Sequence, residues 1–177
     1  MTLRVFIDTC ALYPPLLRSL MLATTEAGLV RPLWSTRVLD EWVIATARKA
    51  PDRLAEAETD RARLAAAYPE ALCPADPALE AQLSLPDPAD AHVLAAAAAA
   101  DADLLVTLNL RDFPRMTLAG LGLEARHPDS LLWELWSAHP AAMERVLAAA
   151  LPGLAPPDRR GPLKRARLSR LGKAQAA

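Results

Sequence analysis

Residues 87–114 read DPADAHVLAAAAAADADLLVTLNLRDFP, and this stretch predicts the fold class. Asp90 opens an apolar segment with six consecutive alanines, Ala95 to Ala100, which predicts a helix that packs very close to a neighbour. The segment Asp103-Leu-Leu-Val-Thr-Leu108 is short and apolar, as in a buried strand, and Asn109 follows it directly. A helix that leads into a buried strand is typical of proteins built on a parallel sheet.

The flanking sequence continues this alternation of strands and helices. A second buried strand is predicted at Leu3-Arg-Val-Phe-Ile7, which ends at Asp8, and a short edge strand at Leu121–Ala125. Proline-rich residues 69–88 predict a loop with a short helix near Leu79. Further helices are predicted from Pro14-Pro15 to Gly28, after the N-cap Ser35, over residues 53–68, over 129–137 and over 140–151. The pattern predicts an α/β sandwich around a parallel sheet.

Two polar residues stand directly after the predicted strands. Asp8 follows the first strand and Asn109 follows the strand of residues 103–108. In open parallel sheets, ligands bind at the carboxyl ends of the strands. We therefore expect both side chains at the same edge of the sheet.

Further acidic residues have local explanations when each is taken alone. Asp87 and Asp90 can favour the dipole of the helix that they precede, Glu41 beside Asp40 can lie on a solvated helix face, and Asn109 with Asp112 can form a turn. Taken together, carboxylates gathered at a sheet edge repel one another unless a cation holds them. Oxygen ligands without clustered Cys or His favour Mg²⁺ or Mn²⁺, and such ions suit phosphoryl chemistry.

The charge of the chain is unevenly distributed. The 20 basic and 21 acidic residues sum to −1. Seven basic residues and no acid lie from Arg159 to the C-terminus, which leaves 13 basic and 21 acidic residues, or −8, in the remainder. We predict a flexible Pro/Arg-rich tail over residues 152–177. Three alternative roles are open to it: phosphate contacts with a nucleic acid, simple solubility, or docking on another copy of the chain.

Several classes of protein are excluded by composition. The longest uncharged apolar run, Val93–Ala100, is too short to cross a membrane, and the N-terminus lacks the long apolar region of a signal peptide. The two cysteines, Cys10 and Cys73, stand in no CxxC motif. A cytoplasmic protein with reduced thiols is the expectation.

The motifs around these acids resemble the PIN domain family. They are the strand running into Ile7-Asp8-Thr9, the helix with Leu39-Asp40-Glu41, and the double motif from Asp87 to Pro114, which is the most specific part. The resemblance covers residues 3–114 and implies a three-layer α/β/α sandwich, with a PIN-like nuclease domain over residues 1–127 and helices over 128–151 packing on it. It also implies a Mg²⁺- or Mn²⁺-dependent endoribonuclease, of which many bacterial members are VapC-like toxins of toxin–antitoxin pairs.

The resemblance assigns roles to individual residues. Asp8, Glu41 and Asp90 match the three most characteristic acids, whereas Asn109 stands where many members have Asp, with Asp112 as the following acid. Asp8 and Asp90 would hold the ion, Glu41 would orient or deprotonate the attacking water, and Asn109 and Asp112 would bind a second ion or position the first.

Neighbouring residues complete the predicted site. Thr9 and Thr107 adjoin the acids, and Arg111 and Arg115 lie close enough to contact phosphate, so we expect these four to bind substrate. His92 points away from Asp90 on a helix, which favours packing or surface exposure over catalysis.

Two other functions compete with this hypothesis. A haloacid-dehalogenase-like phosphatase also opens with a strand-terminal Asp, but it usually needs a second Asp where this chain has Cys10. A degenerate PIN module that binds RNA or protein without catalysis is the alternative, and Asn109 gives it weight. The expected partners are an RNA substrate, an antitoxin protein and a second copy of the chain, with no membrane.

Overall fold

The protein, described for residues 2–175 by a computed structural model, is built on a five-stranded parallel sheet of order β3-β2-β1-β4-β5. The strands are β1 (Leu3–Ile7), β2 (Val30–Ser35), β3 (Leu72–Cys73), β4 (Leu104–Val106) and β5 (Glu124–Arg126). The predicted α/β/α sandwich with a mainly parallel sheet is confirmed, because every pairing in this sheet is parallel.

Eleven α-helices and four short 3₁₀ turns surround the sheet in the described chain. The helices are α1 (Thr9–Leu12), α2 (Pro15–Glu26), α3 (Thr36–Lys49), α4 (Leu54–Ala67), α5 (Pro77–Glu80), α6 (Ala91–Ala99), α7 (Arg115–Gly120), α8 (Pro128–Ala138), α9 (Pro140–Ala150), α10 (Pro156–Arg165) and α11 (Ser169–Ala174). The 3₁₀ turns are Pro51–Arg53, Pro69–Ala71, Pro88–Asp90 and Leu110–Asp112.

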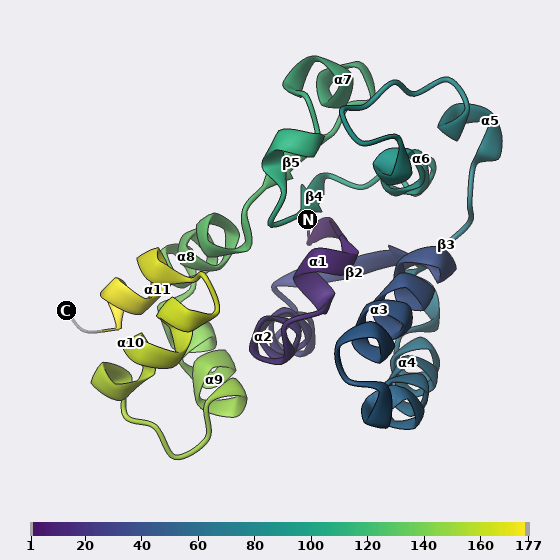
Figure 1. Cartoon of the computed structure of the whole chain (residues 1–177). Helices are drawn as coiled ribbons and strands as arrows, with labels where there is room; N and C mark the ends of the chain where they lie inside the picture. Colours follow the sequence, from purple (N-terminus) through teal and green to yellow (C-terminus); the bar gives the residue numbers. More distant parts are fainter. Residues whose placement is uncertain (1, 176–177) are drawn as a thin grey trace.

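The helices form layers on the two faces of the sheet (Figure 1). Helices α5, α6 and α7 lie on one side and α1 to α4 on the other, while α8 to α11 gather in a lobe beside α2. The alanine run makes α6 slim, and its residues from Ala91 to Ala97 are all buried. This slim helix packs against β2, as the run of small side chains predicts.

Strand β2 was not predicted from the sequence. Its segment Val-Arg-Pro-Leu-Trp-Ser contains Pro32, which cannot donate a ladder hydrogen bond and argues against a strand inside a sheet. Pro32 is tolerated because β3 pairs only with Trp34 and Ser35, so that β2 has a single neighbour, β1, at the proline. Ser35 caps α3 as predicted, its side chain accepting a 3.2 Å hydrogen bond from the Val38 amide.

The C-terminal segment differs from the expected flexible tail. From Pro156 to Ala174 it forms α10 and α11, and Leu163, Leu168 and Leu171 are fully buried. Each buried leucine contributes about 1.5–3 kcal/mol to stability. The basic composition had suggested a solvated end, but these three apolar residues give it a packed face; residues 176 and 177 lie outside the described residues.

No helix among residues 2–175 has the length and apolar character needed to span a bilayer.

Candidate active site

Asp8 and Thr107 meet because of the register between β1 and β4. Ile7 pairs with Val106 in the parallel ladder, so the next residue of each strand emerges at the same sheet edge. The Asp8 amide donates to the Val106 carbonyl at 3.1 Å, and the Thr107 hydroxyl donates to Asp8 Oδ2 at 2.7 Å. Asp8 is only 6% exposed, and this contact fixes its carboxylate at the base of a cavity.

Cys10 also contacts Asp8. Its thiol donates to Asp8 Oδ2 at 3.0 Å and accepts from the Leu108 amide at 3.1 Å. Burial, together with the neighbouring Asp8 charge, raises the pKa of the Cys10 thiol to about 12. The thiol therefore stays protonated at neutral pH and serves as a hydrogen-bond donor to the carboxylate rather than as a nucleophile.

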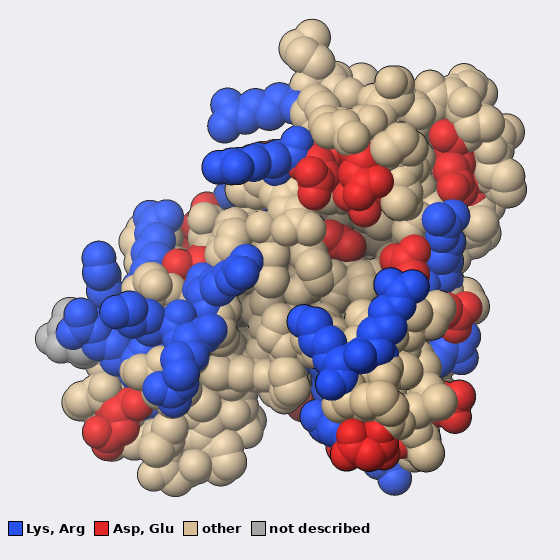
Figure 2. All heavy atoms as spheres, viewed as in Figure 1, with Lys and Arg blue, Asp and Glu red and all other residues tan. Residues whose placement is uncertain are grey.

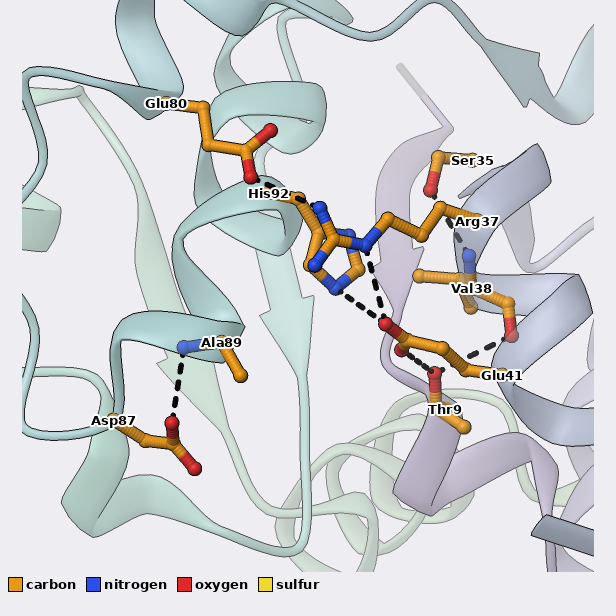
Figure 3. A network of polar contacts seen from close by, with 9 residues as sticks. All are labelled: Thr9, Ser35, Arg37, Val38, Glu41, Glu80, Asp87, Ala89 and His92. Atoms are coloured by element: carbon orange, nitrogen blue, oxygen red, sulfur yellow. Dashed lines mark hydrogen bonds and ion pairs between the residues drawn. The ribbon is translucent and has the colours of Figure 1, made fainter. Parts of the chain in front are cut away.

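Glu41 is held by three side chains from three elements (Figure 3). The His92 Nε2 lies 3.0 Å from Glu41 Oε1, Arg37 lies 3.3 Å from the same oxygen, and the Thr9 hydroxyl donates to Oε2 at 3.0 Å. Partial burial opposes ionisation, but His92, Thr9 and Arg37 outweigh it and lower the pKa of Glu41 below its usual value. Glu41 is consequently a carboxylate at neutral pH, with a fixed orientation.

Asp90 is the acid of the site whose pKa is raised. Its carboxyl is half-buried at the end of the 3₁₀ turn before α6. Desolvation, followed by the charges of Asp8, Asp87 and Asp112, raises the pKa of Asp90 to about 6. Asp87 itself caps this turn, since its carboxylate accepts a 2.9 Å hydrogen bond from the Ala89 amide.

One cavity of about 490 Å³ collects most of the predicted site residues: Asp8, Thr9, Glu41, Asp90 and Asn109. Asp112 does not line this cavity, although it is close enough for its charge to act on Asp90. Thr107 is fully buried behind Asp8, so its hydroxyl contacts the acid rather than the cavity. Arg111 and Arg115 are exposed and lie outside the cavity lining.

The structure brings to this cavity several residues to which the sequence assigned no individual place in the site. Cys10 and His92 contact the acids, and Lys49, Arg165 and Arg167 line the cavity wall. His92 is buried, as the helix pattern favoured, but its ring reaches Glu41 rather than only filling space. This contact joins α6 to α3, two segments far apart in the chain, and has no local sequence signal.

The oxygen donors and the negative charge of the site suit a divalent cation, but the described side chains are not arranged as a complete metal site. Among residues 2–175, no three His, Cys, Asp or Glu side chains are arranged as a closed ligand set. Burial first, and then the charges of Asp8, Asp87 and Asp112, raise the pKa of Asp90, so the metal-free site disfavours a further negative charge. A bound cation relieves this repulsion, and oxygen donors of Asp8, Asp90 and Asn109 around one cavity suit Mg²⁺ or Mn²⁺.

Comparison with known proteins identifies the family. A family model described as PIN domain matches residues 4–111, which is more than half of the chain and contains β1, α3, α6 and β4. Searches of curated proteins and of solved structures each gave no match. The matched region carries Asp8, Glu41, Asp90 and Asn109. The chain belongs to the PIN domain family.

Proposed function

We propose that this protein is a Mg²⁺- or Mn²⁺-dependent endoribonuclease that hydrolyses phosphodiester bonds of RNA. PIN domains are generally nucleases and usually use divalent metal ions. The observation that carries the proposal is the meeting of Asp8, Glu41 and Asp90, from three distant segments, at one cavity on the carboxyl edge of the sheet. Ligands bind at this edge in parallel α/β sheets.

Asp8, Asp90 and Asn109 would hold the cation, with Asp112 nearby to add negative charge. A bound divalent ion supplies Lewis acidity, which neutralises charge on the scissile phosphate and favours ionisation of water. The chain's own residues prepare this site: Thr107 and Cys10 hold Asp8, so its carboxylate is oriented before any ligand arrives.

Glu41 is assigned to orienting the attacking water. Its lowered pKa makes it a weak proton acceptor, whereas its fixed carboxylate is well suited to accept a hydrogen bond. His92, Arg37 and Thr9 occupy part of its hydrogen-bonding capacity and prevent rotation. Arg111 and Arg115 are exposed and follow Asn109 along the chain, and we expect them to contact RNA outside the cavity.

We further propose that the protein is the toxin of a toxin–antitoxin pair and forms a homodimer. The support is the resemblance of its motifs to VapC-like PIN proteins. A small DNA-binding protein encoded in the adjacent reading frame, and growth arrest on expression of this chain alone, are the expected observations. Suppression of the arrest by Asp8→Asn would tie it to the cavity.

The central test measures Mn²⁺ binding by calorimetry together with cleavage of a labelled RNA. We expect Asp8→Asn and Asp90→Asn to abolish cleavage and to weaken Mn²⁺ binding. Asp52→Asn, an exposed aspartate on the turn after α3, is the matched control and should retain both activities. If the parent chain binds RNA but neither binds Mn²⁺ nor cleaves RNA, the protein is the alternative, a degenerate PIN module without catalysis. Asn109 and the lack of a closed ligand set among the described residues favour this alternative.

A further inference from the structure

Three basic side chains line the same cavity as the acids. They are Lys49, the last residue of α3, Arg165, the last residue of α10, and Arg167, in the turn that follows α10. Within residues 2–175, none of the three forms an ion pair with a carboxylate, although Asp8, Glu41 and Asp90 line the same cavity. The cavity is therefore lined both by acidic and by basic side chains that do not pair with one another.

The arrangement of charge is visible on the surface (Figure 2). Basic side chains gather over the C-terminal helices and over α3, on both sides of a central hollow, and acidic side chains lie above this hollow. The Lys49 ammonium lies over the ring of Tyr13, 4.6 Å from its centroid, and both residues line the cavity. The basic lining of the cavity is thus contributed by two segments far apart in sequence.

The chain from Arg165, at the end of α10, to Arg167, in the turn after it, has a defined backbone. Arg167 adopts a left-handed conformation with φ of 62°, and its amide donates to the Lys164 carbonyl at 3.1 Å. The Leu168 amide then donates to the Leu163 carbonyl at 2.8 Å, and both leucines are fully buried. This pattern ends α10 sharply and fixes the backbone of the turn.

Two anchors away from the cavity hold this turn in place. Arg159 is buried and pairs with Glu144 of α9 at 2.8 Å. The Asp129 carboxylate accepts hydrogen bonds from the Arg170 and Leu171 amides, at 2.8 and 2.9 Å, and so caps α11. Of the basic residues in this segment, Arg159 therefore has a structural contact, whereas Arg165 and Arg167 remain at the cavity wall.

We propose that Arg165 and Arg167, with Lys49, form a subsite for the backbone phosphates of single-stranded RNA that adjoin the scissile phosphate. The inference deepens the proposed nuclease function and rests on it for the identity of the ligand. An RNA strand carries one negative charge per nucleotide, so one phosphate can meet the acids of the cavity through a cation while neighbouring phosphates meet its basic side chains. Guanidinium groups bind phosphate with two parallel hydrogen bonds, which suits Arg165 and Arg167.

The test compares two variants of equal charge in the full-length chain. Arg165→Gln/Arg167→Gln removes two charges at the cavity, whereas Arg160→Gln/Lys173→Gln removes two exposed charges of the same segment that do not line it. Binding of a fluorescein-labelled 12-nucleotide RNA is measured in EDTA, so that no cleavage occurs, at several salt concentrations. Circular dichroism and thermal midpoints check that both variants fold.

We expect the cavity variant to bind RNA roughly 25-fold more weakly at 0.1 M salt, with the salt slope reduced by about 1.4, the value for two lost phosphate contacts. The control variant should change affinity by less than about twofold, since it loses no contact. Lys49→Gln should weaken binding by roughly fivefold. Equal losses in the two double variants, or no loss in either, would overturn the subsite.

Cleavage by the same proteins in Mg²⁺ separates this inference from the proposed function. A parent that binds RNA through Arg165 and Arg167 but never cleaves would refute the nuclease and keep the subsite. A parent that cleaves while the cavity variant binds as tightly as the parent would keep the nuclease and refute the subsite. A parent that binds no RNA would overturn the subsite and leave the basic turn to an acidic segment of a protein partner.

Discussion

The Thr107 hydroxyl, buried at the end of β4, donates a 2.7 Å hydrogen bond to Oδ2 of Asp8 at the end of β1. The same hydroxyl oxygen accepts a 3.0 Å hydrogen bond from the backbone amide of Asn109. One side chain therefore links the two strand ends that supply the predicted metal ligands. Its position follows from strand register, since Thr107 comes directly after Val106, the partner of Ile7.

Thr107→Val should destabilise the chain and reduce cleavage. This substitution keeps the shape of the side chain but removes the hydroxyl. Asp8 Oδ2 then keeps only the hydrogen bond from the Cys10 thiol, and the backbone amide of Asn109 loses its acceptor. A lost hydrogen bond to a charged group costs about 1.5–3 kcal/mol, which urea unfolding measures. Thr107→Ser retains the hydroxyl and should retain most of the cleavage activity; equal activity of the valine and parent proteins would show that this link has no functional role.

His92→Ala should lower kcat roughly tenfold and leave KM nearly unchanged. His92 is buried and holds Glu41 Oε1 at 3.0 Å, so its loss releases the carboxylate that is assigned to orient water. A tenfold effect corresponds to about 1.4 kcal/mol of transition-state stabilisation. His92→Gln, whose amide nitrogen can reach the place of Nε2, should recover part of kcat. A rise in KM without a fall in kcat would place His92 in substrate binding instead.

Asp90→Asn should stabilise the metal-free protein at pH 8 while abolishing cleavage. Because the folded-state pKa of Asp90 is raised from its ordinary value of 3.8 to about 6, its charge opposes folding above pH 6. The opposition disappears as pH falls through 6 towards 4, since the folded protein then binds the proton. The gain in thermal midpoint should therefore be largest at pH 8 and vanish near pH 4.

The stability control for this experiment is Asp52→Asn, at an exposed residue. This substitution should change the free energy of unfolding by no more than about 0.5 kcal/mol at every pH. Saturating Mn²⁺ should remove the advantage of Asp90→Asn, because the cation stabilises the parent by binding its folded state. A variant no more stable than the parent at pH 8 would contradict the repulsion between these carboxylates.

Leu171→Ala should destabilise the protein by about 2–5 kcal/mol, the usual cost of a buried leucine, because this side chain is fully buried in α11. Leu54→Ala, at a leucine 39% exposed on α4, is the matched control and should cost less than about 1 kcal/mol. Thermal unfolding measures both. Similar midpoints for Leu171→Ala and the parent would restore the expectation of a solvated tail.

Deletion of residues 159–177 would remove buried leucines together with the basic residues and would expose the core that they cover. Point substitutions are therefore the appropriate test of the basic residues.

Local patterns predicted much of the fold. Proline at the start of α2, Ser35 at the start of α3 and short apolar runs ending at Asp8 and Asn109 each gave a signal within a few residues. Strand β2 lacked such a signal, because Pro32 argues against a strand and is tolerated only where one neighbour is present. Helices α10 and α11 were not predicted for a related reason, because proline and arginine concealed the spacing of Leu163, Leu168 and Leu171.

The sequence by itself determined the parallel α/β class and the order of the acids along the chain, because hydrophobic periodicity and the residue after each strand are local properties. Only the tertiary structure decided which groups contact those acids. The contacts of Glu41 with His92 and of Asp8 with Thr107, and the approach of Arg165 and Arg167 to the cavity, join segments far apart in the chain. Their positions depend on strand register and helix packing, which are set by the whole core and not by any one stretch of sequence.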